Sequence, residues 1–170
     1  LEHNVEDIRS LAMLSAKACR LYRDPEHEVT HPLEWFGLGR CHFRDGNHEK
    51  ALRFLKKSLE THLPEELRCV AMRDVGILLK KAGAFDEAVA IWEAMLVSDG
   101  VFRLFPYEEL AKYYEHVARE PEKALVLVER ALEHLRISSG NPLDHGWILS
   151  WQRDILRKLE IRLKRLRRKA

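Results

Sequence analysis

Apolar residues recur along most of this chain at intervals of three and four, which places their side chains on one face of an α-helix. The first such run is Ile8, Leu11, Ala12, Ser15, Ala18 and Leu21. The pattern predicts a helix over about 5–22 and then three pairs of helices, over 32–45 and 48–62, 65–82 and 85–97, and 106–118 and 121–137. Glycines, prolines and short polar segments separate these ranges. The chain is therefore predicted to be all-α.

The three pairs of helices are copies of one unit. Each copy has a small or apolar pair, then a loop residue seven positions later, and after five more positions an alanine followed by an aliphatic residue. The copies are Leu38-Gly39…Gly46…Ala51-Leu52, Val75-Gly76…Gly83…Ala88-Val89 and Ala111-Lys112…Arg119…Ala124-Leu125. One helical hairpin cannot bury its apolar face alone, but stacked hairpins can. The repetition predicts a helical-hairpin solenoid.

The glycines of the first two copies suggest how each hairpin closes. Gly39 has no side chain, so we expect the second helix to lie against it with Ala51 opposite, and Gly76 to face Ala88 in the same way. The loop glycines, Gly46 and Gly83, can adopt the positive φ that ends a helix.

The third copy departs from this pattern at both glycine positions. Lys112 replaces the small residue at the helix contact, and Arg119 replaces the turn glycine. We expect the Lys112 stem to lie along the contact while its ammonium group reaches solvent, or the third hairpin to pack more loosely.

This spacing resembles that of the tetratricopeptide repeat family over roughly residues 32–137. The matching residues of the first copy are Trp35, Leu38, Gly39, Gly46, Ala51, Leu55 and Ser58, and His42 stands where the family has tyrosine. The resemblance implies a superhelix of repeats at 32–64, 65–99 and 104–137, the last degenerate. A first helix at 1–22 would precede the repeats, and a closing basic helix at 143–170 would follow them.

In that family, defined positions of each first helix face a concave groove that binds proteins or peptides. The resemblance places there Phe36, Arg40, Phe43, Arg44, Arg73, Lys80, Lys81, Tyr113 and His116. These residues would make a basic groove with interleaved aromatic rings. It suits a protein or acidic peptide, whose carboxylates would meet the cations. The alternative is a nucleic-acid-binding accessory domain, in which the cations contact phosphates and the rings stack on bases.

The end of the chain is strongly basic. Residues 153–170 contain nine Lys or Arg against Asp154 and Glu160, a local net charge of +7 in a chain whose net charge is +2. The apolar residues of this segment share one side of a helix. Two interpretations remain open: the helix caps the solenoid, with Trp147 and Trp151 covering the last repeat, or its basic face meets phosphates.

The opening residues, Leu-Glu-His-Asn-Val-Glu-Asp-Ile-Arg-Ser-Leu, resemble the last motif of ribonuclease-H-like exonucleases of the DEDD type. That resemblance implies Asp7 as a metal ligand and His3 as the group that orients the attacking water. It also implies that residues 1–22 end a nuclease domain and that the repeats are the C-terminal accessory region of a larger bacterial protein.

We expect the chain itself to be non-catalytic and to need no cofactor. Hydrolysis by two metal ions requires several converging carboxylates, and the family's other acidic motifs are absent from these residues. A divalent metal is expected only in a parent nuclease.

The remaining composition excludes several classes of protein. Charges interrupt every apolar run, so we expect no membrane span. Three widely spaced cysteines, Cys19, Cys41 and Cys69, indicate reduced thiols and a cytoplasmic location rather than a disulfide framework or a zinc site.

Overall fold

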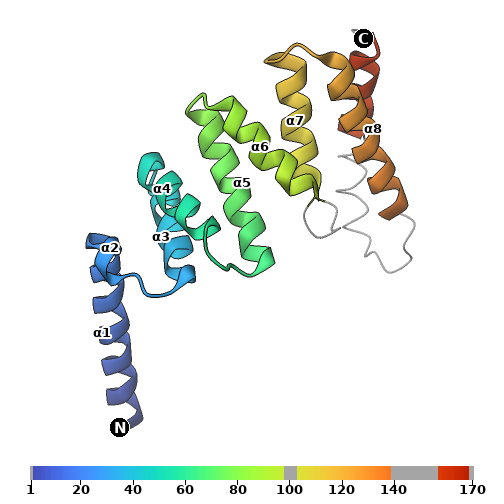
Figure 1. Ribbon diagram of the computed structural model, residues 1–170. Coiled ribbons are helices and arrows are strands. Elements are labelled where there is room, and N and C mark those ends of the chain that lie inside the picture. Colours follow the sequence, from blue (N-terminus) through green and yellow to red (C-terminus); the bar gives the residue numbers. More distant parts are fainter. Residues whose placement is uncertain (1, 98–102, 139–156, 169–170) are drawn as a thin grey trace. The chain divides into compact units, whose positions relative to one another are not determined.

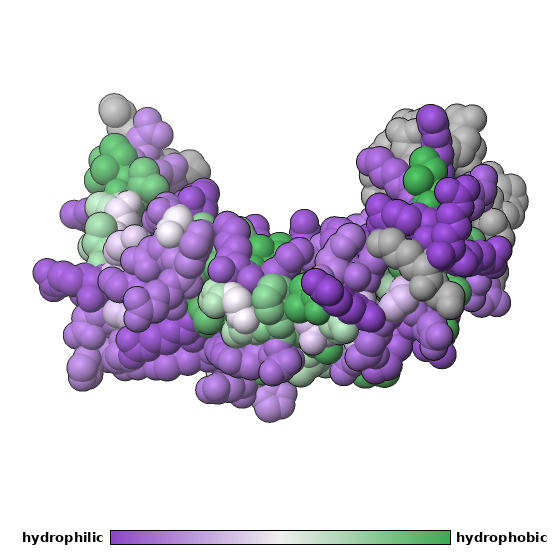
Figure 2. Space-filling model, turned by 90° about the horizontal axis from the view of Figure 1, so that it is seen from above, coloured by the Kyte–Doolittle hydropathy of each residue, from purple (hydrophilic) through white to green (hydrophobic). Residues whose placement is uncertain are grey.

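The computed structural model describes residues 2–97, 103–138 and 157–168 (Figure 1). Within these ranges the regular structure is entirely helical, which confirms the predicted all-α class. The chain divides into two compact units, Leu1–Gly83 and Ala84–Ala170. The boundary falls inside the predicted second repeat. On the face drawn in Figure 2, hydrophilic residues (purple) cover most of the surface and hydrophobic residues (green) form smaller patches.

The first unit contains five helices in sequence. They are α1 (Glu2–Arg23), α2 (Pro25–Glu28), α3 (Pro32–Arg44), α4 (His48–Leu59) and α5 (Glu65–Lys81). Helices α3 and α4 pack together, and α4 also packs against α5. This contact between consecutive helices is the arrangement expected of stacked hairpins.

The turn between α3 and α4 follows the sequence prediction. Gly46 has a φ of +77°, the left-handed conformation that glycine adopts at little cost. The Asn47 side chain then caps α4 by accepting a hydrogen bond from the Lys50 backbone N–H at 3.3 Å. The chain therefore reverses within a few residues and starts the second helix with a satisfied cap.

The close contact at Gly39 is real, but the residue opposite is not the predicted one. A Cβ at Gly39 would lie 2.6 Å from Leu55 Cγ and 3.0 Å from the Leu55 backbone nitrogen. Leu55 stands one turn after Ala51 on α4, and both residues are fully buried. The prediction that Gly39 faces Ala51 was wrong by one helical turn, because the helices cross one turn farther along α4.

The core of the first unit consists of small and aliphatic side chains from the repeat helices. It comprises Leu38, Ala51, Phe54, Leu55, Cys69, Ala71, Met72, Val75, Leu78 and Leu79. Gly76 is buried as well.

The second unit contains α6 (Phe85–Val97), α7 (Leu104–His116), α8 (Pro121–Ser138) and helical residues 157–166. Helix α7 packs against both α6 and α8. The buried apolar residues of this unit are Ala88, Trp92, Met95, Leu110, Ala111, Ala124, Leu127, Val128, Ala131, Leu132, Leu135, Leu159 and Leu166. The last two come from the closing helix and place it against the unit's core. The start of that predicted helix, residues 143–156 with Trp147 and Trp151, lies outside the described residues.

The α7–α8 hairpin forms without either glycine. Arg119 adopts a φ of +58°, so an arginine has the left-handed conformation that Gly46 has in the first hairpin. The Lys112 ammonium group reaches the carboxylate of Glu109 at 2.5 Å and keeps a side-chain exposure of 42%. The charge of the lysine therefore stays near water, as expected.

Candidate partner-binding site

Helix α3 presents the predicted groove residues of the first repeat on one side. Phe36, Arg40, Phe43 and Arg44 follow one another at intervals of four, three and one, so their side chains share one face. Arg44 and Arg40 are exposed, and both phenylalanines are half-buried. A Cβ at the neighbouring Gly37 would have no atom within 4 Å, so this face is open to a partner.

Helix α5 presents a second row of cations within the same unit. Arg73, Lys80 and Lys81 are exposed, and Ile77 lies half-buried between them on the same face. The Lys81 ammonium nitrogen is 3.5 Å from His48 Nε2. The α5 row is therefore a mixture of basic groups and aliphatic surface.

An ion pair joins the two rows. Arg40 Nη1 lies 2.5 Å from Asp74 Oδ2, and the Asp74 side chain is only 6% exposed. We call the surface formed by Phe36, Arg40, Phe43, Arg44, Arg73, Lys80 and Lys81 the α3–α5 face. The predicted partner-binding role of Arg40 must be reduced, because part of its charge is already neutralised by a carboxylate from the next repeat.

The third-repeat candidates, Tyr113 and His116, lie on α7 in the second unit. The Tyr113 ring is half-buried, with its centroid 6.0 Å from that of Phe85. The His116 side chain is exposed, and its Nε2 lies 3.6 Å from Glu115 Oε2. The structure therefore brings together seven of the nine predicted groove residues in one unit and holds the other two separately.

The sequence analysis did not predict that Asp74, Glu109 and Glu115 are buried, and two of these carboxylates, Asp74 and Glu115, bind arginines. Asp74 lies among buried Met72, Val75 and other apolar residues of α5, and Glu115 has a fully buried side chain on α7. A signal for them exists in the sequence, since each is an acidic residue at a position where the helical pattern expects a core residue. Such a charge needs a partner.

The partners of Glu115 come from the closing helix. Glu115 Oε2 accepts hydrogen bonds from Arg165 Nη2 at 2.8 Å and from Arg162 Nε at 3.1 Å. Arg167 pairs with the exposed Glu129 at 2.9 Å. Three arginines of the basic segment thus bind carboxylates of the same unit, which favours the interpretation of this helix as a cap.

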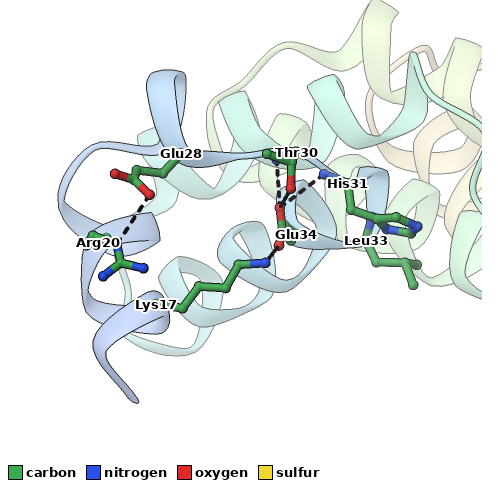
Figure 3. A network of polar contacts seen from close by, with 7 residues as sticks. All are labelled: Lys17, Arg20, Glu28, Thr30, His31, Leu33 and Glu34. Carbon is green, nitrogen blue, oxygen red and sulfur yellow. Dashed lines mark hydrogen bonds and ion pairs between the residues drawn. The ribbon is translucent and has the colours of Figure 1, made fainter. Parts of the chain in front are cut away.

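A polar network holds the end of α1 to the start of α3 (Figure 3). Glu34 Oε2 accepts hydrogen bonds from the backbone N–H groups of Thr30 and His31 at 2.8 and 3.0 Å. The Lys17 ammonium group lies 2.5 Å from Glu34 Oε1. The bond from Lys17 and the backbone donors lower the pKa of Glu34 to about 2. The His31 side chain accepts from the Leu33 N–H and completes a capping box.

The predicted nuclease residues, His3 and Asp7, both belong to α1. Asp7 is exposed. Within the described ranges, no group of three or more His, Cys, Asp or Glu side chains could hold a metal ion. Both residues stay predictions about a larger protein, and so does the metal.

The three cysteines, all within the described residues, form no disulfide. Cys19 is exposed, and the buried Cys69 donates a hydrogen bond from its thiol to Glu65 Oε1 at 3.0 Å. None of the helices in the described part of the chain is both long enough and apolar enough to span a membrane.

Comparison with known proteins identifies the first repeat. Residues 32–61 match the family model described as "Tetratricopeptide repeat". The match confirms the resemblance drawn from the sequence pattern, and its limits correspond to α3 and α4.

A curated relative extends the similarity to nearly the whole chain. The uncharacterized protein YprB of Bacillus subtilis (strain 168) is 26% identical over 170 residues, which are 99% of this chain and 38% of the relative. The chain thus spans well under half of that protein's length. The exonuclease-like opening is not addressed by either similarity and remains a prediction. In sum, the chain resembles a tetratricopeptide repeat at residues 32–61 and an uncharacterized, much longer bacterial protein along almost all of its length.

Proposed function

We propose that this chain is a non-catalytic interaction module that binds an acidic segment of a partner protein on the α3–α5 face. The observation that carries the proposal is the pair of adjacent exposed rows, one on α3 and one on α5, that combine cations with aromatic surface. The coarser role, a scaffold for protein interaction, is the usual role of the tetratricopeptide repeat matched at 32–61.

The chemistry of this face suits an extended acidic peptide. Arg44 and Arg73 can each donate two parallel hydrogen bonds to a carboxylate, which lysine cannot. Leu33, in the first turn of α3, is 39% exposed and offers apolar contact for one side chain of the peptide. The Arg40–Asp74 pair lies between the rows and would orient the peptide, since Asp74 repels carboxylates that approach too deeply.

We further propose that the chain works as the C-terminal accessory region of a larger, cytoplasmic, exonuclease-like polypeptide. The support is the His3 and Asp7 pattern at the opening and the length of the Bacillus subtilis relative. In this proposal the metal and the catalytic carboxylates belong to the remainder of that polypeptide.

Fluorescence anisotropy with a labelled acidic peptide that contains one leucine tests the binding site. Replacing Arg44 and Arg73 together with glutamate should weaken binding at least about tenfold, because two charge-assisted contacts become repulsive. The matched control replaces two exposed cations of α8, Lys123 and Arg130, with glutamate and should leave affinity unchanged. Equal affinity of both double variants would refute the α3–α5 site.

Single-stranded RNA and DNA serve as competing probes for the alternative, a nucleic-acid-binding accessory domain. Binding that is stronger than that of the peptide and falls steeply on a log–log salt plot would replace the peptide proposal. Degradation of either strand by the purified chain with Mg²⁺ or Mn²⁺ would overturn the non-catalytic assignment.

A further inference from the structure

Helix α1 exposes large apolar side chains along its first three turns. The exposed fractions are 51% for Val5, 68% for Ile8, 66% for Leu11 and 65% for Leu14. We call these four residues the α1 stripe. Exposed single apolar residues are ordinary, but a contiguous set on one helix marks an interaction surface.

The α1 stripe is unusually wide. Its members are three residues apart, and since successive residues are about 100° apart around a helix, each step of three turns the side chain by about 60°. The stripe therefore extends over about half of the helix circumference. Three small residues, Ala12, Ser15 and Ala18, and one charged residue, Asp7, fall within the same half, whereas Glu6, Arg9, Lys17 and Arg20 fall in the other.

The contacts that attach α1 to the first repeat come from its last two turns. Lys17 binds Glu34, and the Tyr22 ring stacks on His42 with 4.5 Å between centroids. Every residue from Asn4 to Arg20 is nonetheless exposed. A helix without tertiary support is marginally stable in water, so the first turns need a partner that covers the stripe.

We propose that the α1 stripe is the docking surface for a folded domain carried by the same polypeptide. This inference rests on the proposed larger polypeptide and names the part of the chain that contacts its other domain. The width of the stripe favours a domain over a second α1, because a pair of like helices covers only a narrow seam.

The number of apolar residues also favours a tethered domain. A specific interface between separate proteins uses about 20–30 residues on each side, whereas the α1 stripe offers four large side chains. A covalent link raises the effective concentration to the millimolar range, so a small apolar surface is sufficient.

The test compares thiol labelling in the full-length natural polypeptide and in the 170-residue chain. Ile8→Cys reports on the stripe, and Met13→Cys is the matched control, because Met13 is 72% exposed and lies on the opposite side of α1. Both are made after Cys19→Ser and Cys41→Ser, which remove the more accessible thiols. In the full-length polypeptide the maleimide rate at Ile8→Cys should fall at least about tenfold, and that at Met13→Cys should change less than about twofold. Hydrogen exchange of the unsubstituted polypeptide should show α1 protected by a similar factor.

Three outcomes would overturn the proposal. The first is equal labelling of Ile8→Cys in both polypeptides. The second is protection that appears in the 170-residue chain alone and rises with its concentration, which would assign the stripe to a second copy. The third is a natural gene that encodes nothing beyond these residues. Peptide binding to the α3–α5 face is measured on the 170-residue chain, so its failure is separate from each of these results.

Discussion

The first and third hairpins, α3–α4 and α7–α8, reach the same fold with different residues at three equivalent positions. The pairs are Gly39 and Lys112 at the helix contact, His42 and Glu115 one turn later, and Gly46 and Arg119 in the turn. In the first hairpin, glycine fills two of the three positions, the helix contact and the turn, without strain or charge. The third fills all three with charged residues. The same backbone arrangement therefore forms either with residues that fit these positions or with charged residues whose charges are compensated by contacts elsewhere in the unit.

His42 on α3 and Glu115 on α7 occupy equivalent positions, which we call the polar slot. Each is stabilised by a different neighbouring helix. His42 is 1% exposed, both of its ring nitrogens lack a hydrogen-bond partner, and its ring lies against those of Tyr22 and Phe54. The Glu115 side chain is also buried but binds Arg162 and Arg165. The neutral ring of His42 is covered by the Tyr22 ring of α1, and the carboxylate of Glu115 by cations from the closing helix. The flanking helix determines which polar residue the slot can hold.

The largest difference between the two slots should appear when the Glu115 charge is removed. Glu115→Gln should lower the free energy of unfolding by about 3 kcal/mol, because Arg162, with a side chain only 14% exposed, loses its carboxylate partner. Urea unfolding measures the loss. Glu129→Gln removes the exposed partner of Arg167 and should cost less than about 1 kcal/mol. Similar losses for both variants would mean that the closing helix is not held by Glu115.

The helix contact at Gly39 should show the next largest effect. Gly39→Ala places a methyl group 3.0 Å or less from Leu55 backbone and side-chain atoms, so α3 and α4 must separate. We expect a loss of about 2 kcal/mol in thermal or urea unfolding.

The control for that variant lies on the same helix. Gly37→Ala enters open space and should raise stability by up to about 1 kcal/mol, because alanine favours the helix. A Gly39→Ala variant as stable as Gly37→Ala would show that the two helices do not need the glycine.

The turn should respond in opposite directions in the two hairpins. Arg119→Gly relieves a left-handed arginine and should raise the free energy of unfolding by about 1 kcal/mol. Gly46→Ala introduces the same strain into the first hairpin and should lower it by about 1 kcal/mol. Differential scanning calorimetry gives both values. Shifts of the same sign would contradict the equivalence of the two turns.

These positions also show what the sequence could and could not predict. Spacing alone located α1 and α3 to α8 to within three residues and identified Arg119 as a turn residue, because helix periods and turns are local properties. It missed α2, a single turn in a segment predicted to be a polar connection. The pairing of Gly39 with Leu55 instead of Ala51 depends on how two helices cross. That crossing depends on side chains distant in the chain.

The candidate site divides in the same way. The exposed cations of α3 and α5 followed from repeat position. The neutralisation of Arg40 by Asp74 did not, because the pairing joins residues 34 positions apart. A sequence pattern assigns residues to a face but does not show which of their charges are already paired.

The start of the two hairpins offers a smaller contrast. Helix α3 begins with the capping box of His31 and Glu34, whereas Arg103 at the start of α7 makes no side-chain cap. Glu34→Gln should cost about 1 kcal/mol at neutral pH, since glutamine keeps part of the cap but loses the charge that Lys17 binds.

The acid dependence of that variant is the sharper measurement. Glu34 has a folded pKa of about 2 against an ordinary value of 4.5, so its contribution is present above about pH 5 and is lost as the pH falls toward 2. Urea titrations at several pH values should show that the free energy of unfolding of Glu34→Gln lacks the decrease between about pH 5 and pH 2 that Glu34 causes. Glu28→Gln, which removes the exposed partner of Arg20, should keep it.

The smallest effect on stability at neutral pH is expected at His42, whose contribution depends on whether its ring is protonated. Burial lowers the pKa of His42, the Lys50 ammonium lowers it further, and Asp45 opposes them. A folded pKa below the unfolded value near 6.5 means that stability is full above that pH and falls as the pH drops through the folded pKa. His42→Phe keeps the ring stack with Tyr22 and Phe54, so it should leave stability at pH 8 nearly unchanged and remove that loss. His27→Gln is the control, because Asp24 raises the pKa of His27, whose contribution is therefore lost as the pH rises rather than falls. A His42→Phe variant that loses stability between pH 7 and 5 as steeply as the unsubstituted chain would show that the slot does not hold a neutral ring, and the contrast with Glu115 would fail.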